Sequence, residues 1–203
     1  MTIYNFPGLA ARSGPFVDEV RSVATSLSID PNWLLTVMQV ESAIDPKATN
    51  KQGGATGLIQ FMPATAKAYG TTTDALRSMS DVKQLEYVRR FYARYSGKID
   101  SVGTLYMLTF YPSVAFEPRE TVIARKGEPV YDQNVVLDAD KNGVLTVGDV
   151  KSKAENALYL HSLRGPFVPR QGVPESVKDG VTSNVIAMVI VAGGLWLYRR
   201  AKK

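Results

Sequence analysis

The chain has 203 residues, 45% of them hydrophobic, which allows one domain with a packed core plus further segments. It has no cysteine and one histidine, His161, which excludes thiol nucleophiles, disulfides and the usual zinc hydrolase ligand sets. The formal net charge is +5, but four basic residues lie in the last five positions, leaving 20 basic against 19 acidic side chains before them, and no nucleic-acid-binding surface is expected.

The first third of the chain predicts helices joined by one long loop. A helix opens at Ser13 and Pro15 and carries apolar residues at helical spacing. A second helix has Asp30 as its N-cap and spans residues 31–42. Residues 44–62 are rich in Gly, Asn and Thr and predict a loop. A short helix is expected from position 63 to position 70.

The sequence from residue 81 to residue 163 also predicts mainly helix. Further helices are expected at residues 81–95, 101–110 and 147–163. Residues 117–136 show no clear period and predict either a short hairpin or an extended loop. The fold class expected is therefore mainly α.

The two ends of the chain differ. The N-terminus shows no secretory signal peptide. Residues 181–198 carry no charge, include Trp196 and Tyr198 near their end, and run into the basic tail 199–203. A buried core helix and an interfacial helix are the alternatives, but the basic end and the absence of a polar face favour a transmembrane helix. It would follow a linker at 166–180 and would leave the preceding domain on the non-cytoplasmic side of a lipid membrane.

Glu41 is the first candidate for chemistry. Leu34, Met38 and Glu41 are spaced by four and then three residues, so they share one face of the second helix. A carboxyl group on an apolar face loses solvation, and its pKa should rise. A carboxyl protonated near neutral pH is suited to act as a general acid on a glycosidic oxygen. The alternative from this pattern alone is an exposed helical glutamate.

The residues after Glu41 form an ordered pattern. It reads Glu41-Ser42, Asp45-Pro46, then Gly54-Ala55-Thr56-Gly57-Leu58-Ile59-Gln60-Phe61-Met62-Pro63. This pattern resembles the catalytic core of lysozyme-like lytic transglycosylases of the SLT family, in the form found in phage virion and tail-associated proteins. The resemblance covers residues 16–70 and extends to about residue 116.

The resemblance implies a lysozyme-like domain over residues 1–165 that binds peptidoglycan glycan strands and needs no cofactor for catalysis. Glu41 would be the catalytic acid, and Ser42 would donate to the substrate or orient Glu41. Gln60 would bind an N-acetyl group or a hydroxyl, and Met62 would line an apolar wall, with ordinary core packing as the alternative for Met62. The family's Ala-Tyr-Asn triplet is absent, and Tyr106 is the candidate for its tyrosine, with a core aromatic as the alternative.

The resemblance also implies a reaction. Lytic cleavage between N-acetylmuramic acid and N-acetylglucosamine needs one carboxyl group, whereas most glycoside hydrolases use two. Asp45 lies past the helix end and is expected to form a turn before Pro46. The expected enzyme is a membrane-anchored phage virion protein that opens the cell wall during entry. Two alternatives stay open: a muramidase using Asp45, and a structural virion-membrane protein that binds glycan without cutting it.

Residues 138–149 form a second, independent pattern. Their spacing fits an EF-hand-like calcium loop with glycine at the sixth position and an Asp in place of Glu at the twelfth. The alternative is an acidic turn that caps the next helix. If Ca²⁺ binds, its role would be structural. The expected ligands are Asp138, Asp140, Asn142, Val144 through its carbonyl, and Asp149.

Overall fold

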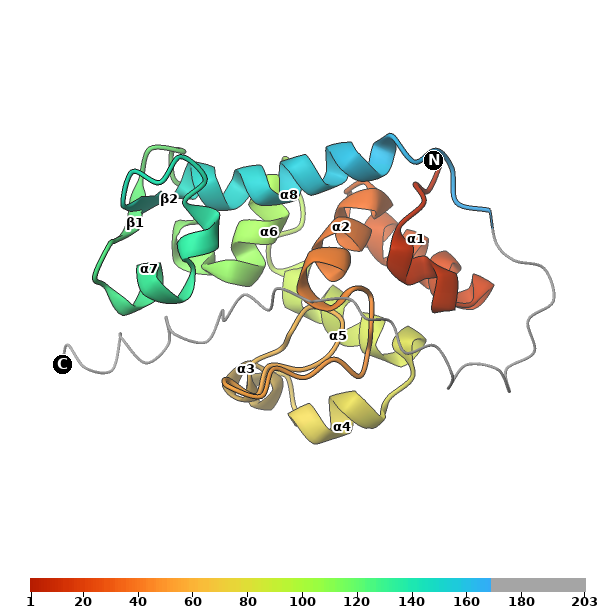
Figure 1. Ribbon diagram of the computed structural model, residues 1–203. Helices are drawn as coiled ribbons and strands as arrows, with labels where there is room; N and C mark the ends of the chain where they lie inside the picture. Colours follow the sequence, from red (N-terminus) through yellow and green to blue (C-terminus); the bar gives the residue numbers. More distant parts are fainter. Residues whose placement is uncertain (169–203) are drawn as a thin grey trace.

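The computed structural model describes residues 1–168 (Figure 1). Within this part of the chain, no helix combines the length and the apolar character needed to cross a bilayer. The predicted transmembrane helix at 181–198, the basic tail and all but the first three residues of the predicted linker lie outside the described residues.

The first half of the described chain is helical, as predicted. Asp30 accepts a hydrogen bond from the backbone N–H of Asn32, which confirms it as the N-cap of the second helix. The six-residue helix α4 (Thr73–Ser78) was not expected, because it is too short to show a period. The elements are η1 (Pro7–Ala11), α1 (Gly14–Leu27), α2 (Pro31–Ser42), α3 (Pro63–Ala68), α4 (Thr73–Ser78), α5 (Asp81–Ala93) and α6 (Val102–Phe110).

The second half corrects one expectation. Residues 117–136 form neither a hairpin of their own nor one extended loop. They contain a short helix at residues 129–133 and a single strand, which pairs with a strand inside the predicted calcium loop. Ala124 lies opposite Leu145 in this antiparallel pair, and both side chains are buried. The elements are η2 (Pro112–Val114), β1 (Val122–Arg125), α7 (Pro129–Gln133), η3 (Val135–Leu137), β2 (Val144–Thr146) and α8 (Val147–Ser162).

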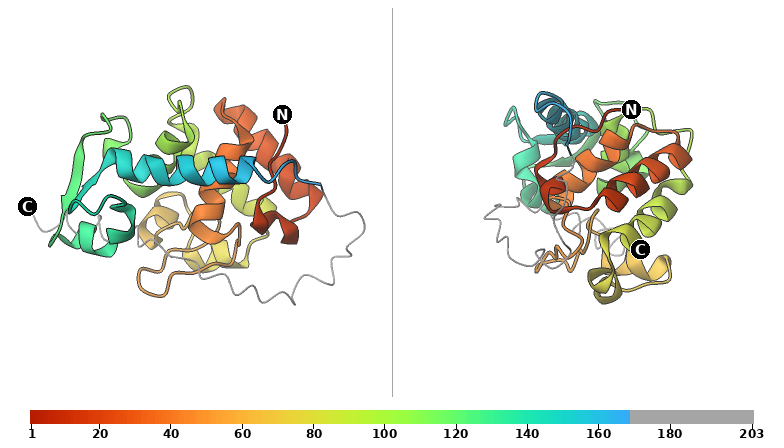
Figure 2. Two further views of the ribbon diagram at one scale, coloured as in Figure 1. Left: turned by 45° about the horizontal axis from the view of Figure 1, so that its top comes forward. Right: turned by 90° about the vertical axis from the view of Figure 1, so that its right-hand side faces the viewer.

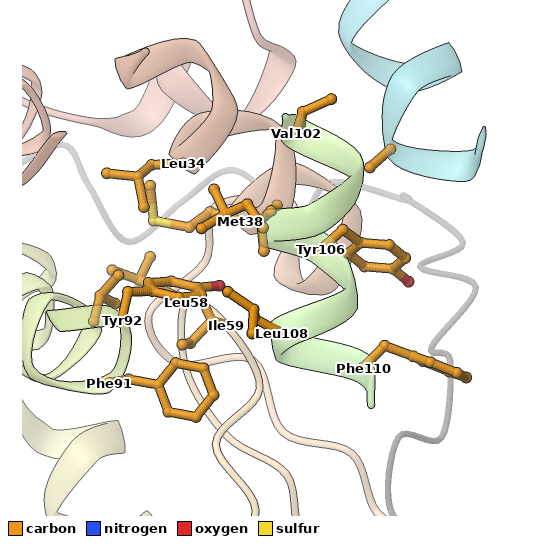
Figure 3. Packing of buried hydrophobic residues seen from close by; sticks show 14 of the residues in the cluster. Leu34, Met38, Leu58, Ile59, Phe91, Tyr92, Val102, Tyr106, Leu108 and Phe110 are labelled. Carbon is orange, nitrogen blue, oxygen red and sulfur yellow. The ribbon is translucent and has the colours of Figure 1, made fainter. Parts of the chain in front are cut away.

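Helix α6 lies at the centre of the packing. It contacts α2 on one side and α8 on another, while α1 packs against α2 and α5. Two views show α8 lying lengthwise across α6 and α2, with the small sheet and α7 at its N-terminal end (Figures 1 and 2). Apolar residues from α2, α5, α6 and the loop before α3 meet in one core (Figure 3).

The two ends of the described chain are held together. Asn5 donates a backbone hydrogen bond to the carbonyl of Gly165 at 2.9 Å, and Phe167 donates to the carbonyl of Ile3 at 2.8 Å. The ring of Phe6 packs on that of His161 near the end of α8, with 4.5 Å between ring centroids. These contacts attach the C-terminal end of α8 to the segment that precedes α1.

Candidate active site

The C-terminal end of α2 presents Glu41. The chain turns directly after it, because Ala43 and Ile44 both adopt left-handed backbone conformations, with φ of 54° and 59°. Such angles are uncommon for residues other than glycine, and Ile44 is β-branched. Its side chain is fully buried, so core packing maintains the turn. The loop that follows is thereby folded back beside the helix end.

Ser42 ties this loop to α2. Its hydroxyl lies 2.9 Å from the carbonyl oxygen of Leu58 and 3.0 Å from that of Met38, and it is placed to donate to both. The side chain is buried. In this structure its donor is therefore used within the protein and fixes the loop next to Glu41, instead of pointing freely toward a substrate.

Gln84 on α5 holds the same loop from the other side, and sequence reasoning missed it. Its Oε1 accepts from the backbone N–H of Leu58 at 3.1 Å, and its Nε2 donates to the carbonyls of Pro46 and Leu76 at 2.6 and 2.7 Å. The side chain is fully buried. The sequence did contain a signal for this role, because Gln84 is spaced from Val88 and Tyr92 so that it shares the apolar face of the helix.

Gly57 is required where the loop meets Gln84. Its φ is 85°, and a Cβ atom at this position would lie 2.5 Å from Oε1 of Gln84. Glycine adopts this backbone angle without steric cost and leaves the space that the glutamine amide occupies. The backbone angle and the contact with Gln84 thus explain why glycine stands first in the Gly-Leu-Ile-Gln run of this chain.

Gln60 and Met62 lie in the same loop. Nε2 of Gln60 donates to the carbonyls of Gly57 and Ala48, at 3.0 and 3.2 Å, so its amino group supports the loop. Its Oε1 accepts no hydrogen bond from the other described residues and stays available as an acceptor. Met62 is half-buried and serves as the N-cap residue of α3.

Glu41 itself is only 7% exposed. Burial raises its pKa from 4.5 to about 7, because desolvation disfavours the carboxylate. Two neighbours oppose this rise: the ammonium group of Lys153 on α8, and the hydroxyl of Tyr106 on α6. A carboxyl group with a pKa near 7 can give up and take back a proton near neutral pH, as acid–base catalysis requires.

Tyr106 is fully buried beside Glu41, and its hydroxyl has no hydrogen-bond partner among the described residues. Its pKa is raised well above the usual value, first by burial and then by the charge of Glu41. Tyr92 on α5 also responds to that charge, while its hydroxyl lies 2.5 Å from Thr109 Oγ1. Tyr106 therefore has a donor available for Glu41, whereas the hydroxyl of Tyr92 is already paired.

Asp45 does not reach this group. It is exposed, and its Oδ1 accepts from the backbone N–H of Lys47 at 2.9 Å, which confirms the predicted turn. No carboxylate is among the groups that shift the pKa of Glu41. Among residues 1–168, therefore, no carboxylate interacts with Glu41 in the way that a second catalytic carboxylate would.

The predicted calcium loop forms a hydrogen-bonded turn. Asp138 accepts from the hydroxyl of Tyr131 at 2.5 Å and from the backbone N–H of Gly143 at 2.9 Å. Asp149 accepts from both the N–H and the hydroxyl of Thr146, in a capping box at the start of α8. Within residues 1–168 no three or more His, Cys, Asp or Glu side chains are arranged to hold a metal ion. The hydrogen bonds are those of a helix-capping turn, and calcium binding stays a prediction.

One family model matches the part of the chain that contains Glu41. Residues 19–87, from α1 to within α5, match the transglycosylase SLT domain. The match includes Glu41, the complete loop and Gln84, whereas α6 and α8 lie beyond it. The buried acid at a helix end, the loop fixed beside it and this match agree, and the chain is a peptidoglycan lytic transglycosylase, a lyase of glycosidic bonds, built on an SLT domain.

Proposed function

We propose that this enzyme cleaves the β-1,4 bond between N-acetylmuramic acid and N-acetylglucosamine, with Glu41 as its single acid and base. Protonated Glu41 gives its proton to the bridging oxygen as the bond to the muramyl C1 breaks. The 2-acetamido group stabilises the oxocarbenium-like state. Ionised Glu41 then takes the proton of the muramyl C6 hydroxyl, whose oxygen bonds to C1 and closes a 1,6-anhydro ring.

The observation that carries this proposal is the burial of Glu41, with no carboxylate of residues 1–168 among the groups that shift its pKa. Burial keeps the group protonated up to about pH 7, as a general acid must be. An inverting hydrolase needs a second carboxyl group to activate water, and a retaining hydrolase needs one as a nucleophile. Asp45, the candidate for that role in a muramidase, is exposed in a turn.

The proposal is tested by mass spectrometry of the fragments released from purified cell walls. We expect muropeptides lighter by one water than the hydrolysed products, and none from Glu41→Gln. Reducing muramyl ends would instead identify a muramidase. Fragments from the wild type and the Glu41→Gln variant alike would exclude Glu41 as the acid, and no fragments from either would favour a binding protein without activity.

We also propose that the enzyme is a phage virion protein held in a membrane by residues 181–198, with its catalytic domain on the non-cytoplasmic side. The support is the uncharged run ending in Trp196 and Tyr198 before a basic tail. Flotation with phospholipid vesicles should carry the full chain upward and should be reduced by Ile190→Lys, which places a charge in the run. Equal flotation of both proteins would contradict the anchor, and immunodetection in purified virions tests the phage assignment.

Calcium binding at residues 138–149 is proposed as a structural function. The support is the set of hard oxygen donors on Asp138, Asp140, Asn142 and Asp149 and on the carbonyl of Val144. Saturating Ca²⁺ should raise the melting temperature of the wild type but not that of Asp140→Ala. An unchanged melting temperature in both proteins would leave the loop as a helix-capping turn.

A further inference from the structure

Helix α5 and the turn after it carry a run of positive charge. Residues 87–99 include four basic side chains and no acidic one: Arg89, Arg90, Arg94 and Lys98. Residues 1–198 have 20 basic and 19 acidic side chains, so the remainder of that stretch has 16 basic against 19 acidic. All four basic side chains of the run are exposed. The positive charge of this part of the chain is therefore gathered on one short segment of the surface.

Arg90 is held against two aromatic rings. Its guanidinium carbon lies 5.4 Å from the ring centre of Tyr87, one helical turn earlier on α5. It also lies 5.9 Å from the ring centre of Tyr69, the residue that ends α3. Both rings are half-buried, so they are fixed by the fold while one side stays open to solvent.

Arg94 repeats this arrangement four residues further along the chain. Its guanidinium carbon lies 4.7 Å from the ring centre of Tyr95. Tyr95 packs in turn against Phe116, which is 51% exposed, with 6.1 Å between ring centres. The residues of the two arrangements form one surface, here named the arginine–aromatic strip: Tyr69, Tyr87, Arg90, Arg94, Tyr95 and Phe116.

The two arginines of the strip keep their N–H donors available. Neither Arg90 nor Arg94 forms an ion pair within 4.0 Å or donates a hydrogen bond among residues 1–168. A ring contact occupies the face of a guanidinium group and leaves its planar fork of donors free for the two oxygens of a carboxylate. The preceding acidic residue of α5, Glu86, pairs with Lys83 at 2.6 Å. Basic residues also suit the negative end of a helix, which explains the charge but not the rings beneath it.

Phe91 joins the strip to the loop beside Glu41. Its ring lies 6.0 Å from that of Tyr69 and meets the ring of Phe61 edge-on, with 5.9 Å between centres. Phe61 stands between Gln60 and Met62 in the loop. The strip therefore borders the loop that carries the candidate substrate-binding residues.

We propose that the arginine–aromatic strip binds the stem peptides of peptidoglycan through their carboxylate groups. The lactyl carboxyl of N-acetylmuramic acid is tied to the stem peptide as an amide, so the anionic groups of this substrate lie on the peptides. A positive surface with free guanidinium forks is complementary to them and holds the enzyme on the wall. The inference rests on peptidoglycan as the substrate in the proposed function, but not on the reaction assigned to Glu41.

The test is co-sedimentation of the full chain, in a non-ionic detergent, with purified peptidoglycan freed of other wall polymers. Glu41→Gln is present throughout, so that the wall is not digested, and this protein is the parent. We expect Arg90→Gln/Arg94→Gln to bind roughly 5- to 10-fold more weakly than the parent at low salt. The difference should shrink in about 0.5 M salt, because exposed charges are then screened.

Lys83→Gln/Arg89→Gln is the matched control. It removes the same charge from the same helix, but its two side chains lie beside Glu19 and Glu86 in a different surface hollow. We expect its affinity to stay within about twofold of the parent. Equal weakening by the two double variants would show an effect of net charge alone and would overturn the proposal.

A second arm changes the wall instead of the protein. Peptidoglycan whose carboxyl groups have been converted to methylamides should bind the parent as weakly as intact peptidoglycan binds Arg90→Gln/Arg94→Gln, and that variant should lose little further. Unchanged binding of the parent to the amidated wall would overturn the proposal. So would weaker binding of the variant to anionic phospholipid vesicles but not to peptidoglycan, which would assign the strip to lipid headgroups. No cleavage is measured, so a failure of the reaction proposed for Glu41 would leave this test intact.

Discussion

Leu58 and Gln84 are joined by a hydrogen bond of 3.1 Å from the backbone N–H of Leu58 to Oε1 of the glutamine. The carbonyl of the same residue, Leu58, accepts from the hydroxyl of Ser42 at the end of α2. One peptide segment of the loop is therefore held by α5 on one side and by α2 on the other. This arrangement fixes the loop relative to Glu41 by contacts that are themselves buried.

Removing the amide of Gln84 should loosen the loop. Gln84→Leu leaves the N–H of Leu58 and the carbonyls of Pro46 and Leu76 without this partner, and we expect a loss of roughly 3 kcal/mol in the free energy of unfolding. Urea unfolding gives the loss, and hydrogen exchange at the amide of Leu58 should quicken. Gln52→Leu, at an exposed position in the same loop, is the matched control. Equal effects of the two substitutions would refute the role given to Gln84.

The activity should decline as pH rises through the pKa of Glu41. The protonated carboxyl is the acid for the first step, and its pKa is about 7. We therefore expect kcat/KM to be halved near that pH and to fall roughly tenfold per pH unit above it. Initial rates on soluble glycan fragments from pH 4 to pH 9 give the profile. A profile flat to pH 9 would show that ionisation of Glu41 does not limit the reaction.

The same pKa shift predicts how stability depends on pH. The folded pKa is raised from 4.5 to about 7, so the folded state binds more protons than the unfolded state between these values, and stability falls as pH rises through the window. Above it, the ionised Glu41 costs roughly 3 kcal/mol. Glu41→Gln has no charge to bury.

The melting temperature of the Glu41→Gln variant should therefore match that of the wild type near pH 4 and exceed it by several degrees at pH 8. Thermal unfolding of the two proteins at both pH values is the measurement. A constant difference between them across this range would mean that Glu41 has an ordinary pKa.

Tyr106→Phe separates stability from activity. The hydroxyl of Tyr106 is buried without a partner, so its removal should leave the free energy of unfolding unchanged or raise it by up to about 1 kcal/mol. The carboxylate of Glu41 would no longer have this hydroxyl available as a donor, and kcat should fall ~10- to 100-fold. Tyr159→Phe, on the exposed face of α8, is the control for both assays. Full activity in Tyr106→Phe would leave this residue as a core aromatic.

Local sequence determined much of this protein. Asp30 and Pro31 start α2 because a carboxylate cap and a fixed φ act within one helical turn. Leu34, Met38 and Glu41 share the buried face of α2, because helical spacing alone decides which side chains lie on one face. The turn at Asp45 followed for the same reason, because its hydrogen bond spans two residues.

Contacts between distant segments were decided only by the tertiary structure. The sequence indicates that the hydroxyl of Ser42 could donate to a substrate, but the fold brings the carbonyl of Leu58 to this hydroxyl. Strand β1 pairs with β2, which lies in the loop before α8. This pairing depends on which strand edges the packing of the helices brings together. Gln84 and Lys153 lie 43 and 112 positions after Glu41 in the chain. Periodicity carries no information across such separations, because the burial of apolar faces between helices sets which side chains meet.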